Sequence, residues 1–581
     1  MNINYYDVLI IGGGYGGIFT LKYCLEENLK VLLLEKNNEY GGVWNINNSP
    51  SVYANTYSVT SKYYLSITDY PIPEEYPEFP HHSLVYEYMK NYVKHFKLEQ
   101  YMSLNSNVIQ IYKEKNIESE SSNIINNNNL WNISYKKNFV DVTVNAKNII
   151  LCTGQNSRCI NMPDINYSKF KGKIIHASEF DETFRNKYCL NKSVLVFGGS
   201  DTAADIADEL TNNMYSNYGK NNNYANYGST APNDSVSKYK TIVYMSMCKG
   251  RWFQRRNLGT NPADMFYNRI VDTVKKIFGK QVINDSFPNE LQLWWGKGGS
   301  QIKEWYPKAG YLNSYYVKSS NVVNKVSLGE IIPKACILEI KENSVVFESI
   351  NNKEDIESEQ NKENLETEQN NEVKIDTIIF ATGYKGMKCF NEIPEYITNG
   401  KYYDHIFLIE DPSVVKIGFI RPYLTSIPMI IEMQARYVSQ VFSNKIKLPT
   451  KDIMEQEYKN MKDKQSKEFS YDYERVQGII DPYDYMDIIA NKIGAVPNLL
   501  NILVEDPQLF YLCMFGSWSH YYYTLNDKNP TKKQIAKEQF LILKDNPTSQ
   551  QISGKIQSGI NNVIFIIIII IVLLFIYMLK K

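Results

Sequence analysis

Hydrophobic residues gather in short unbroken runs along this chain, and two of these runs end at a cluster of glycines. Residues 8–11 read Val-Leu-Ile-Ile and lead into Gly12, and residues 194–197 read Val-Leu-Val-Phe and lead into Gly198. Unbroken apolar runs are typical of strands buried on both faces of a parallel sheet. We therefore expect an α/β fold that contains two separate strand–turn–helix units.

Each unit continues with a helix and a further apolar strand, and other parts of the chain also show strand patterns. In the first unit we expect a helix over 16–27 and a strand over 31–34, and in the second a helix over 202–210 and a strand over 241–245. We also expect an antiparallel stretch over 112–144 and further strands at 148–154 and 375–384. Each of these last two strands leads into a Thr-Gly pair, at Gly154 and at Gly383.

Three low-complexity stretches interrupt this plan, at residues 118–129, 212–237 and 351–372. Each is rich in Asn, Glu, Ser or Lys and poor in apolar residues, so burial cannot offset the entropy lost on ordering. We expect disordered insertions without chemistry at these places.

Charge and cysteine usage exclude several classes of function. The chain of 581 residues has 63 basic and 63 acidic side chains, so no global field attracts nucleic acid. Its eight cysteines include no C-x-x-C pair and its six histidines form no ligand cluster, so we expect neither a disulfide framework nor a metal site. This cysteine usage suits a reducing compartment.

The C-terminal end carries an unbroken apolar run from Val563 to Leu579, followed by two lysines. A helix of this length spans about 25 Å, which is near the lower limit for crossing a bilayer. Such a length suits a thin membrane such as the endoplasmic reticulum. A buried core helix is the alternative, but core helices rarely lack a polar face. We expect a single-pass tail anchor with the remaining chain on the cytosolic side.

The first glycine cluster has the spacing of a dinucleotide-binding turn. Gly12 permits the tight turn, Gly14 lets the backbone approach a pyrophosphate, and Gly17 lets the helix pack closely on the strand. The start of that helix offers N–H groups and a positive dipole end to phosphates. Glu35, at the end of the next strand, can accept ribose hydroxyls. An ordinary structural turn is the alternative reading.

The second glycine cluster departs from this pattern. Ser200 and Ala203 replace the second and third glycines. No acidic residue ends the strand that follows, and a basic segment comes soon after it, which favours NADPH over NADH. A solvated basic loop is the alternative for any one of these cations, which are Lys249, Arg251, Arg255 and Arg256.

Taken together, these features resemble the flavin-containing monooxygenase family. A stretch between the two turns matches the family fingerprint at Phe170, Gly172, His176 and Phe180, and its closing phenylalanine resembles the heteroatom-oxidising branch. Further matching segments are Gly41-Gly42-Val43-Trp44, Ser61-Lys62, Thr68-Asp69-Tyr70-Pro71, Phe380-Ala381-Thr382-Gly383-Tyr384, residues 417–422 and residues 432–436.

The resemblance implies FAD on the first turn and NADPH on the second. NADPH would reduce the flavin, O₂ would form a C4a-hydroperoxyflavin, and this species would oxygenate a soft nitrogen or sulfur nucleophile. The cofactor performs the chemistry, so no general acid–base pair is expected. His176 takes a role in coupling the two nucleotide domains. The cofactor-binding residues expected on these grounds are Gly12, Gly13, Gly14, Tyr15, Gly16, Gly17, Glu35, Gly42, Val43, Trp44, Val59, Thr60, Thr153, Gly154, Gly198, Ser200, Thr202, Ala203, Ala204, Asp205, Lys249, Arg251 and Gly383.

The resemblance also implies the domain plan. We expect an FAD-binding domain in two parts, 1–180 and 341–540, an NADP-binding domain over 181–340, and the anchor over 563–579. The expected partners are a small nucleophilic substrate, O₂ and a membrane, without nucleic acid; no pattern indicates one oligomeric state.

Two positions depart from the family pattern. Val59 stands where the family often has an asparagine that contacts flavin and nicotinamide, and the neighbouring hydroxyls of Thr60 and Ser61 are candidates to replace that amide. Cys248 stands where an arginine frequently binds the 2′-phosphate, a task left here to Lys249 or Arg251. Three alternatives therefore stay open: an uncoupled NADPH oxidase that releases hydrogen peroxide, a non-catalytic nucleotide-binding scaffold on a membrane, and a Baeyer–Villiger enzyme.

Overall fold

The structure is a computed structural model. It describes residues 5–48, 52–113, 130–155, 160–211, 241–258, 261–281, 305, 307, 309–319, 321–348, 371–385, 392–423, 425–473, 476 and 478–544. The expected insertions at 118–129 and 212–237 lie outside these residues, as does the third insertion except for its last two residues. The predicted anchor at 563–579 also lies outside them. No helix in the described ranges is long and apolar enough to cross a membrane.

The first sheet has nine strands and is built around β1 (Tyr5–Ile11). Val8, Leu9 and Ile10 are fully buried, as expected for a strand covered on both faces. The strand pairs in parallel with its neighbours on both sides, in the order β17-β18-β19-β6-β1-β2-β3. The neighbours and the edge hairpin are β2 (Val31–Leu34), β3 (Met102–Ser103), β4 (Ser106–Lys113), β5 (Trp131–Lys137), β6 (Val140–Leu151), β17 (Tyr402–Tyr403), β18 (Phe407–Leu408) and β19 (Val414–Lys416).

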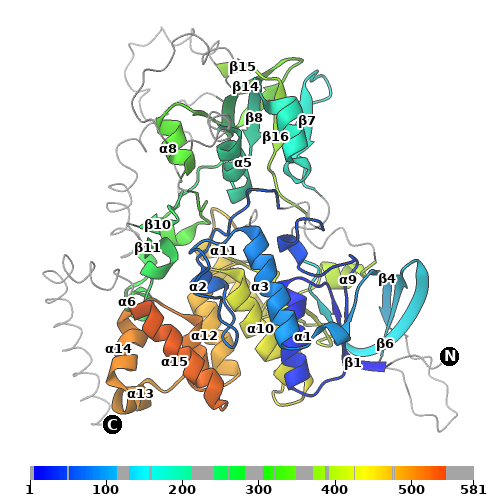
Figure 1. Ribbon diagram of the computed structural model, residues 1–581, viewed down its shortest axis with the longest axis vertical. Helices are drawn as coiled ribbons and strands as arrows, with labels where there is room; N and C mark the ends of the chain where they lie inside the picture. The colour runs from blue at the N-terminus through cyan, green and yellow to red at the C-terminus, as the bar shows by residue number, and fades with distance from the viewer. Residues whose placement is uncertain are drawn as a thin grey trace, which may run out of the picture.

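Two helices cover one face of this sheet and form its main core (Figure 1). Helix α1 (Tyr15–Glu26) packs along α10 (Ile427–Phe442), which comes from the far end of the chain. Strands β4, β5 and β6 form the antiparallel stretch that the sequence predicts, and β6 continues into the parallel part of the sheet.

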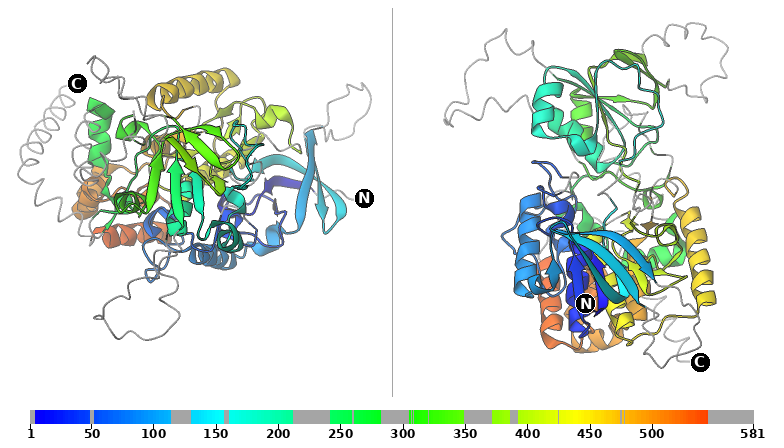
Figure 2. Two further views of the ribbon diagram at one scale, coloured as in Figure 1. Left: turned by 90° about the horizontal axis from the view of Figure 1, so that it is seen from above. Right: turned by 90° about the vertical axis from the view of Figure 1, so that its right-hand side faces the viewer.

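The second sheet is entirely parallel, in the order β12-β9-β8-β16-β7. It forms a separate lobe above the first sheet (Figures 1 and 2). Its central strand leads into helix α5 (Asp201–Thr211), and a small antiparallel sheet packs against its other face. The strands are β7 (Lys173–His176), β8 (Ser193–Phe197), β9 (Ile242–Ser246), β12 (Ile331–Lys334) and β16 (Thr377–Phe380), with β13 (Ile337–Ile340), β14 (Ser344–Phe347) and β15 (Glu372–Lys374) in the small sheet.

The second sheet is an insertion in the first domain. Strand β6 precedes the second sheet in sequence and β19 follows it, yet β6 and β19 pair with each other in the first sheet. Its extent corrects the expected boundaries. Strand β7 lies before residue 181 and strand β16 lies after residue 340, yet both pair within the second sheet. The domain joints therefore lie near residues 160 and 385. The boundaries at 181 and 340 were misplaced because an apolar strand does not show which of two parallel sheets it joins.

The remaining helices cover the first domain and extend its lower end (Figure 1). They are α2 (Lys62–Leu65), α3 (His82–His95), α6 (Arg269–Phe278), α11 (Lys451–Glu468), α12 (Pro482–Lys492), α13 (Leu499–Glu505), α14 (Pro507–Phe515) and α15 (Pro530–Lys544); α4 (Glu182–Phe184), α8 (Asn321–Ser327) and α9 (Glu395–Thr398) are shorter or lie in and beside the second domain. Four short strands complete the strands of the described chain, as two pairs: β10 (Asn257–Leu258) with β11 (Asn261–Pro262), and β20 (Arg421–Pro422) with β21 (Ile479–Ile480).

Candidate cofactor and active site

The first glycine turn lies between β1 and α1, and two of its glycines are required by close backbone contacts. Gly12 has a φ of +111°, and a side chain there would collide with the carbonyl of Cys152. A side chain at Gly17 would collide with the carbonyl of Gly12. These contacts agree with the roles assigned to the first and third glycines of such a turn.

The middle glycine has a different environment. A Cβ atom at Gly14 would meet only Gly42 Cα, at 3.5 Å, and Gly14 lines a cavity. Gly14 also caps α1, whose first turn has no acidic side chain and no side-chain cap. The first N–H groups of the helix are therefore available to an anion. The residues present at this turn fit the pyrophosphate of a dinucleotide such as FAD.

Glu35 at the end of β2 is buried beside this turn. Its Oε2 accepts a hydrogen bond of 2.6 Å from the N–H of Gly13, and its Oε1 accepts one of 2.9 Å from Asn37. A carboxylate oxygen can accept more than one hydrogen bond, so Glu35 keeps capacity for ribose hydroxyls. The backbone N–H groups of Gly13 and Asn37 thus fix the position of the Glu35 carboxylate.

One cavity of about 480 Å³ joins this turn to the second domain. It brings together many of the residues expected from the sequence: Gly12, Gly13, Gly14, Tyr15, Gly16, Glu35, Gly42, Val43, Trp44, Val59, Thr60, Thr153, Gly154, Thr202 and Asp205. The expected residues Gly17, Gly198, Ser200, Ala203, Ala204, Lys249, Arg251 and Gly383 are not among those that line it.

The segment with the unusual Val59 lines the middle of the cavity. Thr60 also lines it, while Ser61 lies behind, with its side chain fully buried. The N–H of Ser61 donates a 2.7 Å hydrogen bond to Asp264. The backbone of this segment is therefore fixed by a hydrogen bond to Asp264, in the turn before α6. Thr60 is the hydroxyl that reaches the cavity wall.

The second glycine turn lies between β8 and α5. A side chain at Gly198 would collide with the carbonyl of Ala381, so this glycine is needed for close packing. Asp201 and Asp205 of α5 both line the cavity. Burial raises the pKa of Asp205 to about 7, and Arg256 opposes this shift from 3.6 Å. The helix after the second turn thus begins with an acidic side chain, whereas the first turn of α1 has none.

The basic residues after β9 differ in their surroundings. The expected 2′-phosphate ligand Arg251 is buried, and its guanidinium donates to Asp472 at 2.6 Å and to the carbonyl of Tyr315 at 3.2 Å. The role of Arg251 at the 2′-phosphate stays a prediction; its partner Asp472 lies 221 residues away and leaves no signal in the sequence. Lys249 and Arg255 are exposed and keep the expected position beside the end of β9.

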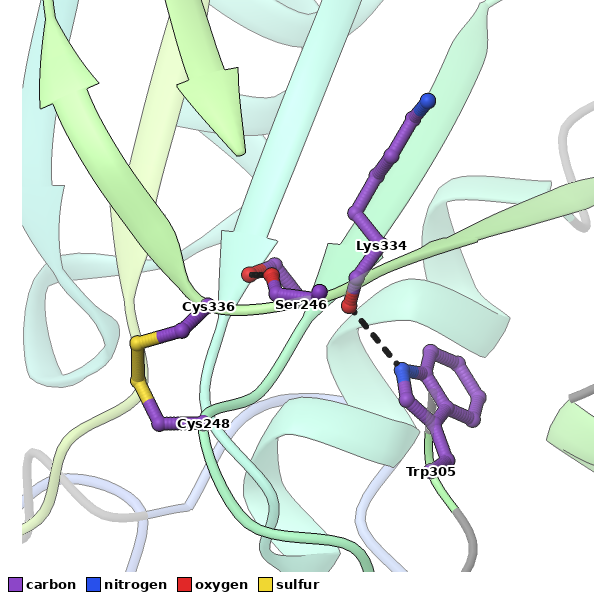
Figure 3. Close-up of a disulfide and its surroundings, with 6 residues drawn as sticks. Ser246, Cys248, Trp305, Lys334 and Cys336 are labelled. Carbon is purple, nitrogen blue, oxygen red and sulfur yellow. Dashed lines mark hydrogen bonds between the residues drawn. A yellow bond between two sulfur atoms is a disulfide. The ribbon is translucent and has the colours of Figure 1, made fainter. Parts of the chain in front are cut away.

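The structure contains a disulfide between Cys248 and Cys336 (Figure 3). The two residues follow the adjacent strands β9 and β12, so their Cα atoms are 4.2 Å apart although 88 residues separate them in sequence. The indole of Trp305 donates to the carbonyl of Lys334 nearby, at 3.1 Å. The absence of a disulfide, expected from cysteine spacing, is thus wrong for this pair, because spacing does not reveal strand neighbours. Among described residues no group could hold a metal ion.

The family fingerprint forms the entry to the second sheet. A side chain at Gly172 would collide with the carbonyl of Asp376, which explains the glycine. His176 is buried, and its Nε2 lies 3.1 Å from the carbonyl of Gly383, where the chain leaves the second sheet. Phe180 contacts the ring of Tyr53 from the first domain edge-on, with centroids 6.2 Å apart. The fingerprint therefore connects the segment that enters the second sheet with the segment that leaves it, and both with the first domain.

The cavity is also lined by residues that were not expected from the sequence. Among them are Tyr315, Lys318 and Arg421. Arg421 lies in the family-like segment 417–422, whereas Tyr315 and Lys318 come from a segment without a motif, and only their approach in space identifies them. Lys318 contacts both domains, as described below.

Comparison with known proteins agrees with this geometry. A family model described as "Flavin-binding monooxygenase-like" matches residues 6–217 and 226–580. The chain belongs to this family. Its reaction class is flavin-dependent monooxygenation, and its cofactors are FAD and NADPH. Similar curated proteins are flavin-containing monooxygenase 5 of Rattus norvegicus, 26% identical over 93% of this chain and 92% of the relative, and dimethylaniline monooxygenase [N-oxide-forming] 2 of Cavia porcellus, 24% identical over 89% and 88%.

Solved structures show the same fold at low identity. S-allyl-L-cysteine S-oxygenase from Allium sativum is 15% identical, with a TM-score of 0.54 over 88% of this chain and 95% of that one. Cyclohexanone monooxygenase from Rhodococcus sp. Phi1 bound to NADP⁺ is 15% identical, with a TM-score of 0.54 over 85% and 98%. These likenesses support the two-domain architecture.

Proposed function

We propose that this chain is an FAD- and NADPH-dependent monooxygenase that oxygenates soft nitrogen or sulfur nucleophiles. FAD would lie at the first glycine turn and NADPH at the second. The observation that carries this proposal is the shared cavity. Gly14 and Glu35 line it at the first turn, and Asp201 and Thr202 line it at the start of α5. Two dinucleotides that meet in one cavity can exchange a hydride directly.

The residues would divide the work by position. FAD supplies oxygen activation when bound, and NADPH supplies the hydride. The N–H groups at the start of α1 would bind the flavin pyrophosphate, and Glu35 would orient its ribose. Thr60 would contact the isoalloxazine region, and Lys249 the 2′-phosphate. The fingerprint at His176 would hold the two domains in register, so that the cavity excludes bulk water.

Anaerobic titration of the flavin-loaded protein with NADPH tests the proposal. We expect the yellow absorbance to bleach with one equivalent, and added O₂ with a model sulfide to yield sulfoxide. A protein that retains no flavin after gentle preparation would instead be the membrane scaffold considered above. Conversion of a ketone to an ester without sulfoxidation would indicate the Baeyer–Villiger alternative.

The oxidase remains a second candidate because of Val59. This side chain lines the cavity without any amide to bind flavin or nicotinamide. Loss of that contact favours escape of reduced oxygen as hydrogen peroxide. The ratio of peroxide to sulfoxide per NADPH distinguishes the two activities. In the variant Val59→Asn we expect the ratio to fall, whereas Val59→Leu is the matched control without an amide.

We also propose that the apolar run at 563–579 anchors the chain in the endoplasmic reticulum membrane, with the two nucleotide domains in the cytosol. Helix α6 supports membrane contact because it buries charged side chains and exposes apolar ones. Helix α6 buries Asp272 and Lys275, and Lys275 pairs with Asp481 at 2.9 Å. Its apolar residues Ile277 and Phe278 are 64% and 59% exposed. A soluble surface helix normally has the opposite arrangement.

Neighbouring helices extend this apolar surface. Helix α14 contacts both α6 and α13, and the three lie together at the lower end of the first domain (Figure 1). On α13, Leu500 and Val504 are 66% and 83% exposed and lie one helical turn apart. Exposed apolar patches of this kind mark interaction sites, and lipid would cover this one when the tail is inserted.

Fluorescence from a polarity-sensitive label tests the contact. We would attach the label at Val504→Cys in the full chain, with Phe139→Cys on the turn between β5 and β6 as the matched exposed control. In phospholipid nanodiscs we expect a spin-labelled lipid to quench the first position only. Equal quenching at both positions, or at neither, contradicts the contact. Carbonate extraction tests the anchor itself, because a chain ending at Lys544 should leave the membrane fraction.

A further inference from the structure

Lys318 connects the two nucleotide turns. Its backbone N–H donates a 2.7 Å hydrogen bond to Asp201 Oδ1, in the first residue of α5. Its Nζ donates a 3.0 Å hydrogen bond to the carbonyl of Thr425, which lies just before α10 in the first domain. The side chain therefore runs along the cavity wall from the second turn to the first domain.

The ammonium group of Lys318 has unused hydrogen-bonding capacity. An ammonium has three N–H donors, and one of them binds the carbonyl of Thr425. Within the described ranges no carboxylate lies at ion-pair distance from this Nζ; the acids Asp201 and Asp264 act on it only from farther away. Burial lowers the pKa of Lys318, and these two acids oppose that shift.

The surroundings of Lys318 contain several buried polar atoms without partners. Among the described residues the hydroxyls of Thr425 and Ser426 have no hydrogen-bond partner, and both residues line the cavity. Buried polar atoms in folded proteins are normally hydrogen-bonded. Their concentration beside a half-paired ammonium indicates that a polar ligand completes this part of the cavity.

The second turn needs such a cation. Asp201 places a carboxylate at the start of α5, where the helix dipole and N–H groups would otherwise attract a phosphate. Ser200 also takes the position of the glycine that normally lets a pyrophosphate approach. Of the nearby arginines, Arg251 is bound to Asp472 and Arg256 faces Asp205. Lys318 lines the cavity, as Arg421 does, and its backbone N–H binds Asp201 at the second turn.

We propose that Lys318 is a further cofactor-binding residue, whose ammonium binds a pyrophosphate oxygen of NADP between the second turn and the first domain. Lys318 would offset the charge of Asp201 and guide the nicotinamide half of the dinucleotide toward the flavin. This inference rests on the proposed function, because it takes NADP as the ligand of the second turn.

Calorimetric titration of the flavin-loaded full chain with NADP⁺ and with adenosine 2′-monophosphate tests the proposal. The second ligand has the 2′-phosphate but no pyrophosphate. In Lys318→Met we expect affinity for NADP⁺ to fall about 10- to 100-fold, as for loss of one hydrogen bond to a charged group. Affinity for adenosine 2′-monophosphate should stay within about twofold. Lys318→Arg should retain most of the NADP⁺ affinity, and Lys341→Met, at an exposed lysine on the small sheet, is the matched control.

A charge-balance variant sharpens the test. Asp201→Asn keeps the oxygen that accepts the N–H of residue 318 but removes the negative charge. We expect this change to restore part of the NADP⁺ affinity when it is added to Lys318→Met. Unchanged NADP⁺ affinity in Lys318→Met would overturn the proposal, and so would an equal loss for both ligands or a selective loss of FAD. Failure of the unsubstituted protein to bind NADP⁺ would refute the proposed function itself.

Discussion

Arg251 and Asp472 form a buried ion pair, with 2.6 Å between Nη1 and Oδ1, although they belong to different lobes of the molecule. The side chains of both residues are almost inaccessible to solvent. Asp472 also accepts the N–H of Tyr315 at 2.7 Å, which fixes the segment that carries Lys318. One carboxylate therefore holds both Arg251 and the cavity-lining residue Tyr315 in place.

Removal of that carboxylate should be strongly destabilising. In Asp472→Leu the buried guanidinium of Arg251 loses its carboxylate and keeps the carbonyl of Tyr315 as an acceptor, so its charge is unpaired and we expect the free energy of unfolding to fall by about 3–5 kcal/mol. The double variant Arg251→Met/Asp472→Leu should recover much of this loss, because no charge is then left unpaired. Urea unfolding measures all three proteins. Glu342→Gln breaks the exposed pair with Lys171 and should change stability by less than about 1 kcal/mol.

Flavin retention should depend on the open space at Gly14. A Cβ there has room in the protein itself, so Gly14→Val should fold with nearly unchanged thermal stability without cofactor. Its branched side chain would occupy the cavity where we place the pyrophosphate, so we expect colourless protein. Absorbance at the flavin band after gel filtration is the measurement. A normally yellow Gly14→Val protein would refute our placement of FAD.

The disulfide should stabilise the second domain. It closes a loop of 88 residues across β9 and β12, and such a cross-link contributes about 2–4 kcal/mol. We expect Cys248→Ser, or reduction by dithiothreitol, to lower the free energy of unfolding by this amount, with little further effect of dithiothreitol on the variant. Peptide mapping under non-reducing conditions checks the bond directly. Recovery of both cysteines as separately alkylated peptides would show that the bond is not formed.

Binding of NADP⁺ should weaken as the pH rises through neutrality. Burial raises the pKa of Asp205 to about 7, so this carboxyl is mostly neutral below that value and anionic above it. An additional negative charge in the cavity repels the phosphates of the dinucleotide. Between pH 7 and pH 9 we expect affinity to fall by about 3- to 10-fold, within the range of one pKa unit of interaction energy. Asp205→Asn should give a flat profile; a slope unchanged by this substitution would assign the effect to another group.

The sequence predicted local units more successfully than contacts between distant segments. The strand 31–34 is observed at the expected residues, and helix α5 differs from its prediction by one residue at each end. Apolar periodicity and glycine spacing determine such units within a few residues, so their signal is local. The same is true of the cavity residues around Gly12–Gly16 and Glu35.

The misplaced features all depend on contacts across long sequence separations. Strand β16 joins the second sheet because it fits between β7 and β8, and its own residues would suit either sheet. Cys336 meets Cys248 because two strands are neighbours. Arg251 forms an ion pair with Asp472, a single acid in a segment without a motif, and the sequence did not predict this contact. Lys318 is found only when the two domains are assembled.

The inside-out charge pattern of α6 has a practical result for handling the protein. Because Ile277 and Phe278 are exposed while Asp272 and Lys275 are buried, a chain without the proposed anchor still has an apolar surface on α6. We therefore expect a tail-less preparation to self-associate in buffer and to become monodisperse only with a mild detergent.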